Sequence, residues 1–251
     1  MIVTKLQGGL GNQLFQWAVT RYLSIKYNTD YKFELSYFQS MGWELELKKF
    51  KKIIIEEFQI SLTLKIVTDD FNFKEIEDNS FLNGYWQSEK YFSEIDELIR
   101  EDLKIEDNLK NYIINKYPIL NKNTVSLHVR RGDYIKSNNY HPIQDINYYE
   151  RAYDIIDDKS INILVFSDNI EWCKENIKFD NITYIEGEKN IVDMYIMSLC
   201  THNIIANSSF SWWGAWLNKN ENKKVIVPKN WFGPQVDLYT GDMIPKKWII
   251  I

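Results

Sequence analysis

Apolar residues follow two patterns along the chain, short uninterrupted runs and longer stretches with helical spacing. The run at residues 2–6 predicts a first strand, and the apolar positions in 13–27 repeat every three or four residues, which predicts a helix. Residues 31–35 predict a second strand. Residues 36–120 are less regular, with a charged helix-like stretch at 94–103. The chain therefore opens as strand, loop, helix and strand.

From residue 124 onward the two patterns alternate regularly. Short apolar strands that alternate with helices of about 10–15 residues are typical of βαβ units around a parallel sheet. We therefore predict an α/β protein with two Rossmann-like domains, residues 1–118 and 119–251. In the second domain, strands are predicted at 124–129, 161–166, 182–185, 203–206 and 224–228, and helices at 147–157, 169–177, 191–200 and 209–218.

Composition and charge narrow the class of protein. The 251 residues contain 30 Lys and Arg against 35 Asp and Glu, a formal net charge of −5, so a basic nucleic-acid-binding surface is not expected. No run of about 18 apolar residues is present and the first residues hold no long apolar stretch, so we expect a cytoplasmic protein without a membrane span or signal peptide. The three histidines and two cysteines show no metal-ligand spacing, so no metal site is expected.

The first candidate site is the glycine-rich sequence GGLGNQ at residues 8–13, between the first predicted strand and helix. Glycines allow the backbone to approach a ligand closely, and the start of a helix favours an anion. Leu14 stands where a dinucleotide-binding loop has its third glycine. A binding loop and a simple tight turn therefore both remain open for this segment.

The second candidate site is HVRRGDY at residues 128–134, at the end of a predicted strand. Ligands of open α/β sheets bind beyond the carboxyl ends of the strands. Because side chains alternate along a strand, His128 and Arg130 share one face and Arg131 points to the other. A planar guanidinium can donate two parallel hydrogen bonds to a pyrophosphate. We therefore predict an anion-binding Arg130 and a structural Arg131.

Two more polar groups follow predicted strands. Asp168 comes after 161–166 and either caps the next helix or accepts hydrogen bonds from a base or a ribose. Asn207, Ser208 and Ser209 precede the helix at 209–218. Capping needs only one such residue, so three of them favour a ligand. The tryptophans of that last helix recur at helical spacing and are predicted to pack in the core.

Four segments taken together resemble a known family: GGLGNQLFQWA, HVRRGDY, FSDNIEWCKEN and DMYIMSLCTHNIIANSSFSWWGAWLN. They are similar to the bacterial α-1,2-fucosyltransferases of glycosyltransferase family 11. The resemblance implies a GT-B-like fold, in which two Rossmann-like domains face each other across a cleft. It also implies transfer of L-fucose from GDP-β-L-fucose to the 2-hydroxyl of a galactoside, with inversion and without a metal or other cofactor.

The resemblance further implies partners and a setting for the reaction. The expected partners are GDP-L-fucose and a galactose-containing oligosaccharide or lipid-linked glycan, as in lipopolysaccharide O-antigen biosynthesis. No nucleic acid is expected, and association with the inner membrane would be peripheral at most. The N-terminal domain would lie on the acceptor side, and the C-terminal domain would bind the donor.

The resemblance also implies roles for single residues. Arg130 would bind the donor pyrophosphate, Asp193 would read the guanine, and Asn12 would lie at the reaction centre. The glutamate base of α-1,6 relatives has no counterpart in this sequence, so Asp133 is the candidate general base. The expected catalytic residues are Arg130, Asp133 and Asn12, and the expected donor-binding residues are Gly9, Gly11, Asn12, His128, Arg130, Asp168, Asp193, Asn207, Ser208, Ser209 and Phe210.

Parts of the sequence also fit other functions. Gly9, Gly11 and Glu34 would fit a dinucleotide oxidoreductase, and the many tryptophans would fit a non-catalytic glycan-binding module. Within the glycosyltransferases, a different nucleotide-sugar donor or a different linkage is the alternative. Cofactor absorbance, or glycan binding without a nucleotide, would distinguish the first two from a fucosyltransferase.

Overall fold

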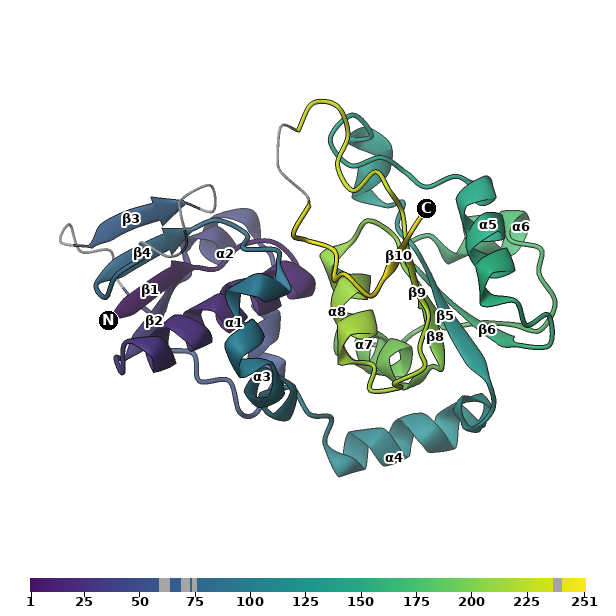
Figure 1. The fold of residues 1–251 in the computed structure, drawn as a ribbon, viewed down its shortest axis with the longest axis horizontal. Coiled ribbons are helices and arrows are strands. Elements are labelled where there is room, and N and C mark those ends of the chain that lie inside the picture. Colours follow the sequence, from purple (N-terminus) through teal and green to yellow (C-terminus); the bar gives the residue numbers. More distant parts are fainter. Residues whose placement is uncertain (59–63, 69–72, 74–75, 237–240) are drawn as a thin grey trace. The chain divides into compact units, whose positions relative to one another are not determined.

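The computed structural model describes residues 1–58, 64–68, 73, 76–236 and 241–251. The chain divides into two compact units, Met1–Lys104 and Ile105–Ile251, and each unit contains a parallel sheet with helices packed on it (Figure 1). The predicted α/β class with two parallel sheets is therefore confirmed. The division falls before helix α4 (Asp107–Lys116), whereas the sequence analysis placed the boundary at residue 118.

The first unit contains a parallel sheet in the order β2-β1-β4-β3. The predicted strand–helix–strand opening is confirmed, because α1 connects β1 to β2 and buries the apolar side of its helical pattern against the sheet. The strands are β1 (Ile2–Lys5), β2 (Tyr31–Glu34), β3 (Lys65–Thr68) and β4 (Ser80–Asn83), and the helices are α1 (Leu10–Lys26), α2 (Ser36–Met41) and α3 (Asp96–Asp102).

The second unit contains a parallel sheet in the order β10-β9-β8-β5-β6-β7. Every strand and helix predicted after residue 124 is present, with ends that differ from the prediction by at most two residues. The strands are β5 (Thr124–Val129), β6 (Asn162–Ser167), β7 (Ile182–Tyr184), β8 (His202–Ile204), β9 (Val225–Val227) and β10 (Ile249–Ile250). The helices after α4 are α5 (Ile146–Ile156), α6 (Ile170–Asn176), α7 (Asn190–Leu199) and α8 (Ser209–Leu217).

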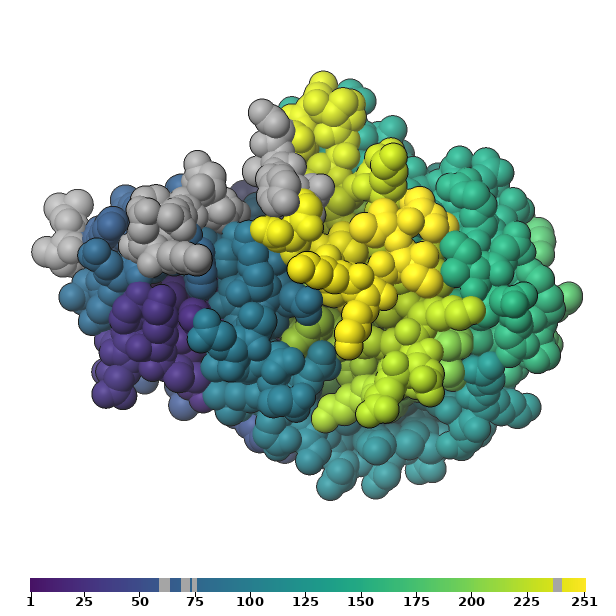
Figure 2. All heavy atoms as spheres, viewed as in Figure 1, coloured from purple at the N-terminus to yellow at the C-terminus, as the bar shows by residue number. Residues whose placement is uncertain are grey.

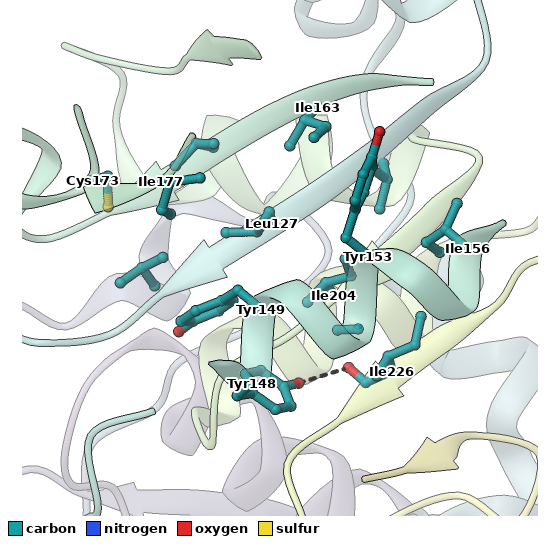
Figure 3. Close-up of a cluster of buried hydrophobic side chains, with 14 of the residues drawn as sticks. Leu127, Tyr148, Tyr149, Tyr153, Ile156, Ile163, Cys173, Ile177, Ile204 and Ile226 are labelled. Carbon is teal, nitrogen blue, oxygen red and sulfur yellow. Dashed lines mark hydrogen bonds between the residues drawn. The ribbon is translucent and has the colours of Figure 1, made fainter. Parts of the chain in front are cut away.

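One face of the second sheet packs against α5 and α6. Its core joins Leu127 of β5, Ile163 of β6 and Ile204 of β8 to the tyrosines of α5 (Figure 3). The Tyr148 hydroxyl donates to the carbonyl oxygens of Ile205, at 2.6 Å, and Ile226, at 3.2 Å. These bonds tie α5 to the backbone of the sheet and satisfy a polar atom that is fully buried.

The other face of the second sheet packs against α7 and α8. The predicted core role of the tryptophans is confirmed, because Trp212, Trp213 and Trp216 are all buried. Helices α7 and α8 approach closely at Gly214, where a Cβ atom would lie 2.9 Å from the side chain of Met197. The C-terminal segment, yellow in Figure 2, runs over the surface of this unit, and the carbonyl of Met243 accepts from the Trp212 indole at 2.9 Å.

Candidate functional site

Polar side chains gather at the carboxyl edge of the second sheet. Strands β5 and β6 pair in parallel up to Val129 and Ser167, so Arg130 and Asp168 leave the sheet side by side. Strand β8 is the other neighbour of β5, and its continuation reaches Ser208 at the start of α8. The carboxyl ends of parallel strands are where open α/β sheets bind ligands.

The Arg130 guanidinium lies between two carboxylates. Its Nη2 is 2.7 Å from Oδ1 of Asp133, and its Nη1 is 3.0 Å from Oδ2 of Asp168. The guanidinium carbon lies 5.3 Å from the centre of the Tyr134 ring. The Arg130 side chain is 29% exposed, so a planar cation is held in one orientation at this edge while part of it reaches solvent.

Asp168 holds the loop that carries both arginines. Its Oδ1 accepts from the backbone N–H of Arg131 at 2.9 Å, and its Oδ2 pairs with Arg130. A Cβ atom on Gly132 would lie 2.6 Å from Oδ2 of Asp168, so this close approach requires glycine. The helix-capping alternative for Asp168 is wrong, because Asn169 caps α6 by accepting from the backbone N–H of Trp172.

Arg131 points away from Arg130, into the packing against α6. Its guanidinium carbon lies 4.0 Å from the centre of the Trp172 ring, a cation–π geometry. Its Nε atom is buried without a hydrogen-bond partner among the described residues. The two neighbouring arginines therefore have different surroundings, as the strand alternation predicts.

His128 lies on the α8 side of β5, with its ring 5.7 Å from that of Phe210. It is 5% exposed, and its Nδ1 is buried without a hydrogen-bond partner in the described part of the chain. Burial, helped by the nearby charge of Arg130, lowers the pKa of His128 to about 3. The imidazole is therefore neutral at any physiological pH and does not act as a cation.

The residues between β8 and α8 have different surroundings. The Asn207 side chain is used within the unit: its Nδ2 donates to the carbonyl of Trp231 at 3.0 Å, and its Oδ1 accepts from Gln144 at 3.2 Å. Ser208 occupies the N-cap position of α8 without making the usual side-chain capping bond. Ser209 and Phe210 form the first turn of α8. This first turn therefore offers backbone N–H groups at the same edge as Arg130.

Asp193 lies in the first turn of α7, which follows β7 and so begins at the same edge of the sheet. Its Oδ1 is buried and has no hydrogen-bond partner among the described residues. Burial raises the pKa of Asp193 to about 7, and the charge of Glu188 adds to the increase. A buried acceptor without a donor is costly in a protein that has no ligand for it.

Glu188 is a neighbour that the sequence analysis missed. Its side chain is 6% exposed. It accepts from the hydroxyls of Tyr117, at 2.8 Å, and Tyr112, at 3.0 Å, and it pairs with the Lys116 ammonium. All three partners come from α4 or the residue after it. The helix that precedes the second sheet thus fixes the loop that leads to Asp193.

The glycine-rich loop belongs to the first unit. Gly8 has a φ of +76°, and a Cβ atom there would lie 2.6 Å from Nδ2 of Asn12. Gly9 is the N-cap residue of α1, and Gly11 lies in its first turn. The Asn12 Oδ1 accepts from Nε2 of Gln87 at 2.7 Å. The loop thus places an oriented amide at the carboxyl end of β1.

In the described ranges, no group of three or more His, Cys, Asp or Glu side chains is arranged to hold a metal ion. The helices of these ranges are also too short or too polar to span a bilayer.

Comparison with known sequences decides the family. The profile of Glycosyl transferase family 11 matches residues 1–251. An alpha-1,2-colitosyltransferase of Escherichia coli is 32% identical, over 100% of this chain and 99% of that protein. This chain belongs to glycosyltransferase family 11. The O-antigen biosynthesis glycosyltransferase WbnK of Escherichia coli is also 32% identical, over 90% of this chain and 93% of that protein.

Membership of family 11 confirms the predicted family and makes the chain a glycosyltransferase. The oxidoreductase and the non-catalytic module are therefore wrong as functions. A galactoside 2-alpha-L-fucosyltransferase of Caenorhabditis elegans is 32% identical over a shorter part, 55% of this chain and 42% of that protein. The relatives thus include enzymes named for α-1,2 linkages and for two different sugars.

Solved structures confirm the predicted GT-B-like fold. The NodZ alpha-1,6-fucosyltransferase aligns with a TM-score of 0.57, at 14% identity, over 85% of this chain and 91% of that one. A glycosyl transferase of family 9 from Veillonella parvula aligns with a TM-score of 0.52, at 9% identity, over 100% of this chain and 86% of that one. At such identities the likeness concerns the fold alone.

Proposed function

We propose that this glycosyltransferase moves L-fucose from GDP-β-L-fucose to the 2-hydroxyl of a galactoside, with inversion and without a metal ion. One observation carries the proposal: the fixed guanidinium of Arg130 and the buried carboxylate of Asp193, whose Oδ1 has no donor among the described residues, lie at the same edge of one sheet. A guanine nucleotide diphosphate supplies a pyrophosphate anion that can pair with the Arg130 guanidinium. Its guanine supplies N–H donors for the Asp193 carboxylate. The names of the α-1,2 relatives support the sugar and the linkage.

In this proposal Arg130 binds the pyrophosphate of the donor. Negative charge grows on the leaving phosphate as the bond to fucose breaks, so donors fixed at that position stabilise the transition state more than the ground state. Asp168 keeps the guanidinium oriented before the ligand arrives. Ser208 and the first N–H groups of α8, at Ser209 and Phe210, lie at the same edge and add uncharged donors. These donors replace a metal ion as the neutralising groups.

Asp193 would read the guanine. The N1–H and the exocyclic amino group of guanine are adjacent donors, and a carboxylate can accept both. Asp193 has an acceptor oxygen that no described group of the protein satisfies. Neutral His128 would line the nucleotide site without adding charge. Adenine and uracil present a different pattern of donors and would leave the carboxylate unsatisfied.

Asp133 is our candidate for the general base. It is 57% exposed and is paired with Arg130 at 2.7 Å. A pyrophosphate that binds Arg130 would release this carboxylate to accept the proton of the acceptor hydroxyl. As it loses this proton, the acceptor oxygen attacks C1 of fucose on the face opposite GDP, and GDP leaves with the electron pair of the broken bond. The Asn12 amide, at the carboxyl end of β1, is our candidate for a group that binds the acceptor.

The experiment is transfer to a panel of β-galactosides from GDP-fucose, with linkage analysis of each product. Family 11 membership extends at full length to a colitosyltransferase, so nucleotide-activated colitose is the second donor to test. We expect an α-1,2-linked fucosyl product, formed equally well in EDTA. If a product forms only from the colitose donor, GDP-fucose is not the donor. A product of another linkage would overturn the assignment of the 2-hydroxyl.

A further inference from the structure

Two glutamines of α1 fix the loops at the carboxyl edge of the first sheet. Both Gln13 and Gln16 are fully buried. The Gln13 amide donates to the carbonyls of Gly8, at 2.9 Å, and Glu44, at 3.0 Å, and its oxygen accepts from the backbone of Glu46 at 2.8 Å. One side chain therefore joins the glycine-rich loop to the segment after α2.

Gln16 makes the matching connection on the other side. Its oxygen accepts from the backbone N–H of Gln7 at 2.9 Å, and its amide donates to the carbonyl of Gly84 at 3.1 Å. Because β1 and β4 are parallel neighbours, these two segments leave the sheet at the same edge. Gln87 then donates to Asn12 at 2.7 Å. Three segments, around residues 8, 44 and 86, are thereby held at the start of α1.

The fixed segments present an aromatic ring and amides. Trp43 is 44% exposed, although indole is among the side chains that gain most from burial. A ring atom of Trp43 lies 3.5 Å from the Cβ position of Gly9, so the indole stands beside the glycine-rich loop. The charged side chain next to it, Glu44, pairs with Lys49 at 3.3 Å. The surface at this edge thus combines a half-exposed aromatic face with the neutral Asn12–Gln87 amide pair.

That combination fits a neutral sugar. One face of a pyranose is made of C–H groups that pack on an indole, and the hydroxyls around its rim both donate and accept hydrogen bonds, as carboxamides do. We propose that Trp43 and the Asn12–Gln87 amide pair form a subsite that takes the pyranose ring of the galactoside acceptor. This inference rests on the proposed function, because it names where the acceptor of that reaction binds.

The hydrogen bonds of α1 also keep the groups of the subsite in place. Gln13 and Gln16 hold the segments from inside the unit, so the indole and the amides keep their spacing without a ligand. Preorganised groups bind with less loss of conformational freedom. Tyr85, which is 40% exposed on the segment that Gln16 holds, is the second aromatic side chain to test.

The test is acceptor binding and acceptor kinetics in Trp43→Ala and Trp43→Phe, with the matched control Ile66→Ala. Ile66 is 69% exposed on β3 of the same unit. At saturating GDP-fucose, we expect Trp43→Ala to raise the KM for lactose about 5- to 10-fold and Trp43→Phe to raise it less. The affinity for GDP, measured by thermal shift, should stay within about twofold, and Ile66→Ala should match the unmodified protein.

A direct binding arm keeps this inference separate from the proposed reaction. Lactose binding in the presence of GDP is measured by saturation-transfer NMR on the same variants. If the protein binds lactose through Trp43 but transfers no fucose to it, the subsite stands and the proposed reaction fails. If lactose does not bind, or if Trp43→Ala changes neither lactose binding nor KM, the subsite is overturned. Melting curves exclude unfolding as the cause of any loss.

Discussion

Nucleotide binding should be coupled to the loss of a proton near neutral pH, through Asp193. This carboxyl is buried in the first turn of α7, and burial together with the charge of Glu188 raises its pKa to about 7. The free protein therefore holds a proton on Asp193 below pH 7. Guanine offers two N–H donors, and only the charged carboxylate can accept one on each of its two oxygens. Binding stabilises the charged form and lowers the pKa of Asp193 in the complex.

The sign and size of the effect follow from this shift. Above pH 7 the carboxylate is charged in the free protein, so the affinity is at its full value. Below pH 7 a proton must leave before the guanine binds, and the affinity falls toward tenfold for each pH unit, or about 1.4 kcal/mol. At pH 6 we therefore expect about tenfold weaker binding than at pH 8. At pH 7 each binding event should release about half a proton.

Competing titrations can be removed by the choice of probe. A terminal phosphate titrates near pH 6, so GDP itself would blur the result, whereas the diphosphate of GDP-fucose is esterified at both ends. Two histidines lie near Arg130: His128, whose pKa is lowered to about 3, and His141, whose ring stacks on Tyr134 at 4.8 Å and whose pKa is lowered by burial. GDP-fucose is therefore the ligand to titrate.

The assay is isothermal titration calorimetry with GDP-fucose between pH 6 and 8, in two buffers with different ionisation enthalpies. The buffer difference gives the protons released. Asp193→Asn should abolish both the proton release and the pH dependence of Kd. Glu188→Gln removes a charge that raises the Asp193 pKa, so it should move the midpoint to lower pH. A Kd that is constant from pH 6 to 8 in the unmodified protein refutes the reasoning.

Four further outcomes follow from the same edge of the sheet. Arg130→Lys keeps the charge but loses the bidentate fork, so turnover should fall about 10²–10³-fold at an unchanged melting temperature. Arg131→Lys loses the planar contact with Trp172, so it should cost about 1–2 kcal/mol of stability in urea unfolding and affect turnover less. Asp133→Asn should lower turnover while GDP affinity in equilibrium dialysis stays equal or improves, because it removes both a base and a competitor for Arg130. Dialysis against EDTA should leave the transfer rate unchanged, and recovery of a lost rate by Mn²⁺ would contradict this.

The second sheet was predictable from the sequence because its strands are short apolar runs between helices of regular period. Strand β5 is buried along its whole length, and its alternation places His128 on one face and Leu127 on the other, as the pattern requires. The first sheet was only half predictable. Strand β3 is largely exposed, and the two apolar residues of β4, Phe81 and Leu82, are adjacent and do not alternate with polar ones, so neither strand shows a clear period. Two-residue β10 is too short for any pattern.

The parts of the site that the sequence did not predict are set by contacts between distant segments. Glu188 lies in a polar loop, and its burial under the tyrosines of α4 has no local signal. Gln13 and Gln16 lie within a helix, where polar residues usually face solvent. Their burial follows from the carbonyls of Glu44 and Gly84, which only the folded unit brings to them. Motifs therefore located the polar loops at the carboxyl edges of the two sheets, but not the groups that hold them.

The arrangement around Arg130 explains how its guanidinium is fixed without leaving its charge unpaired. An isolated guanidinium at a strand end would be poorly fixed, and a fully buried one would be costly. Two carboxylates remove both problems, but they differ in how they are held. Asp168 is bound on both oxygens by the arginine loop, whereas Asp133 is largely exposed and can leave. In the proposed reaction, a pyrophosphate would replace Asp133 as a partner of Arg130, while Asp168 would keep the orientation of the guanidinium. The displaced Asp133 carboxylate would then be available as a base only when the donor is bound, which would link proton removal to donor binding.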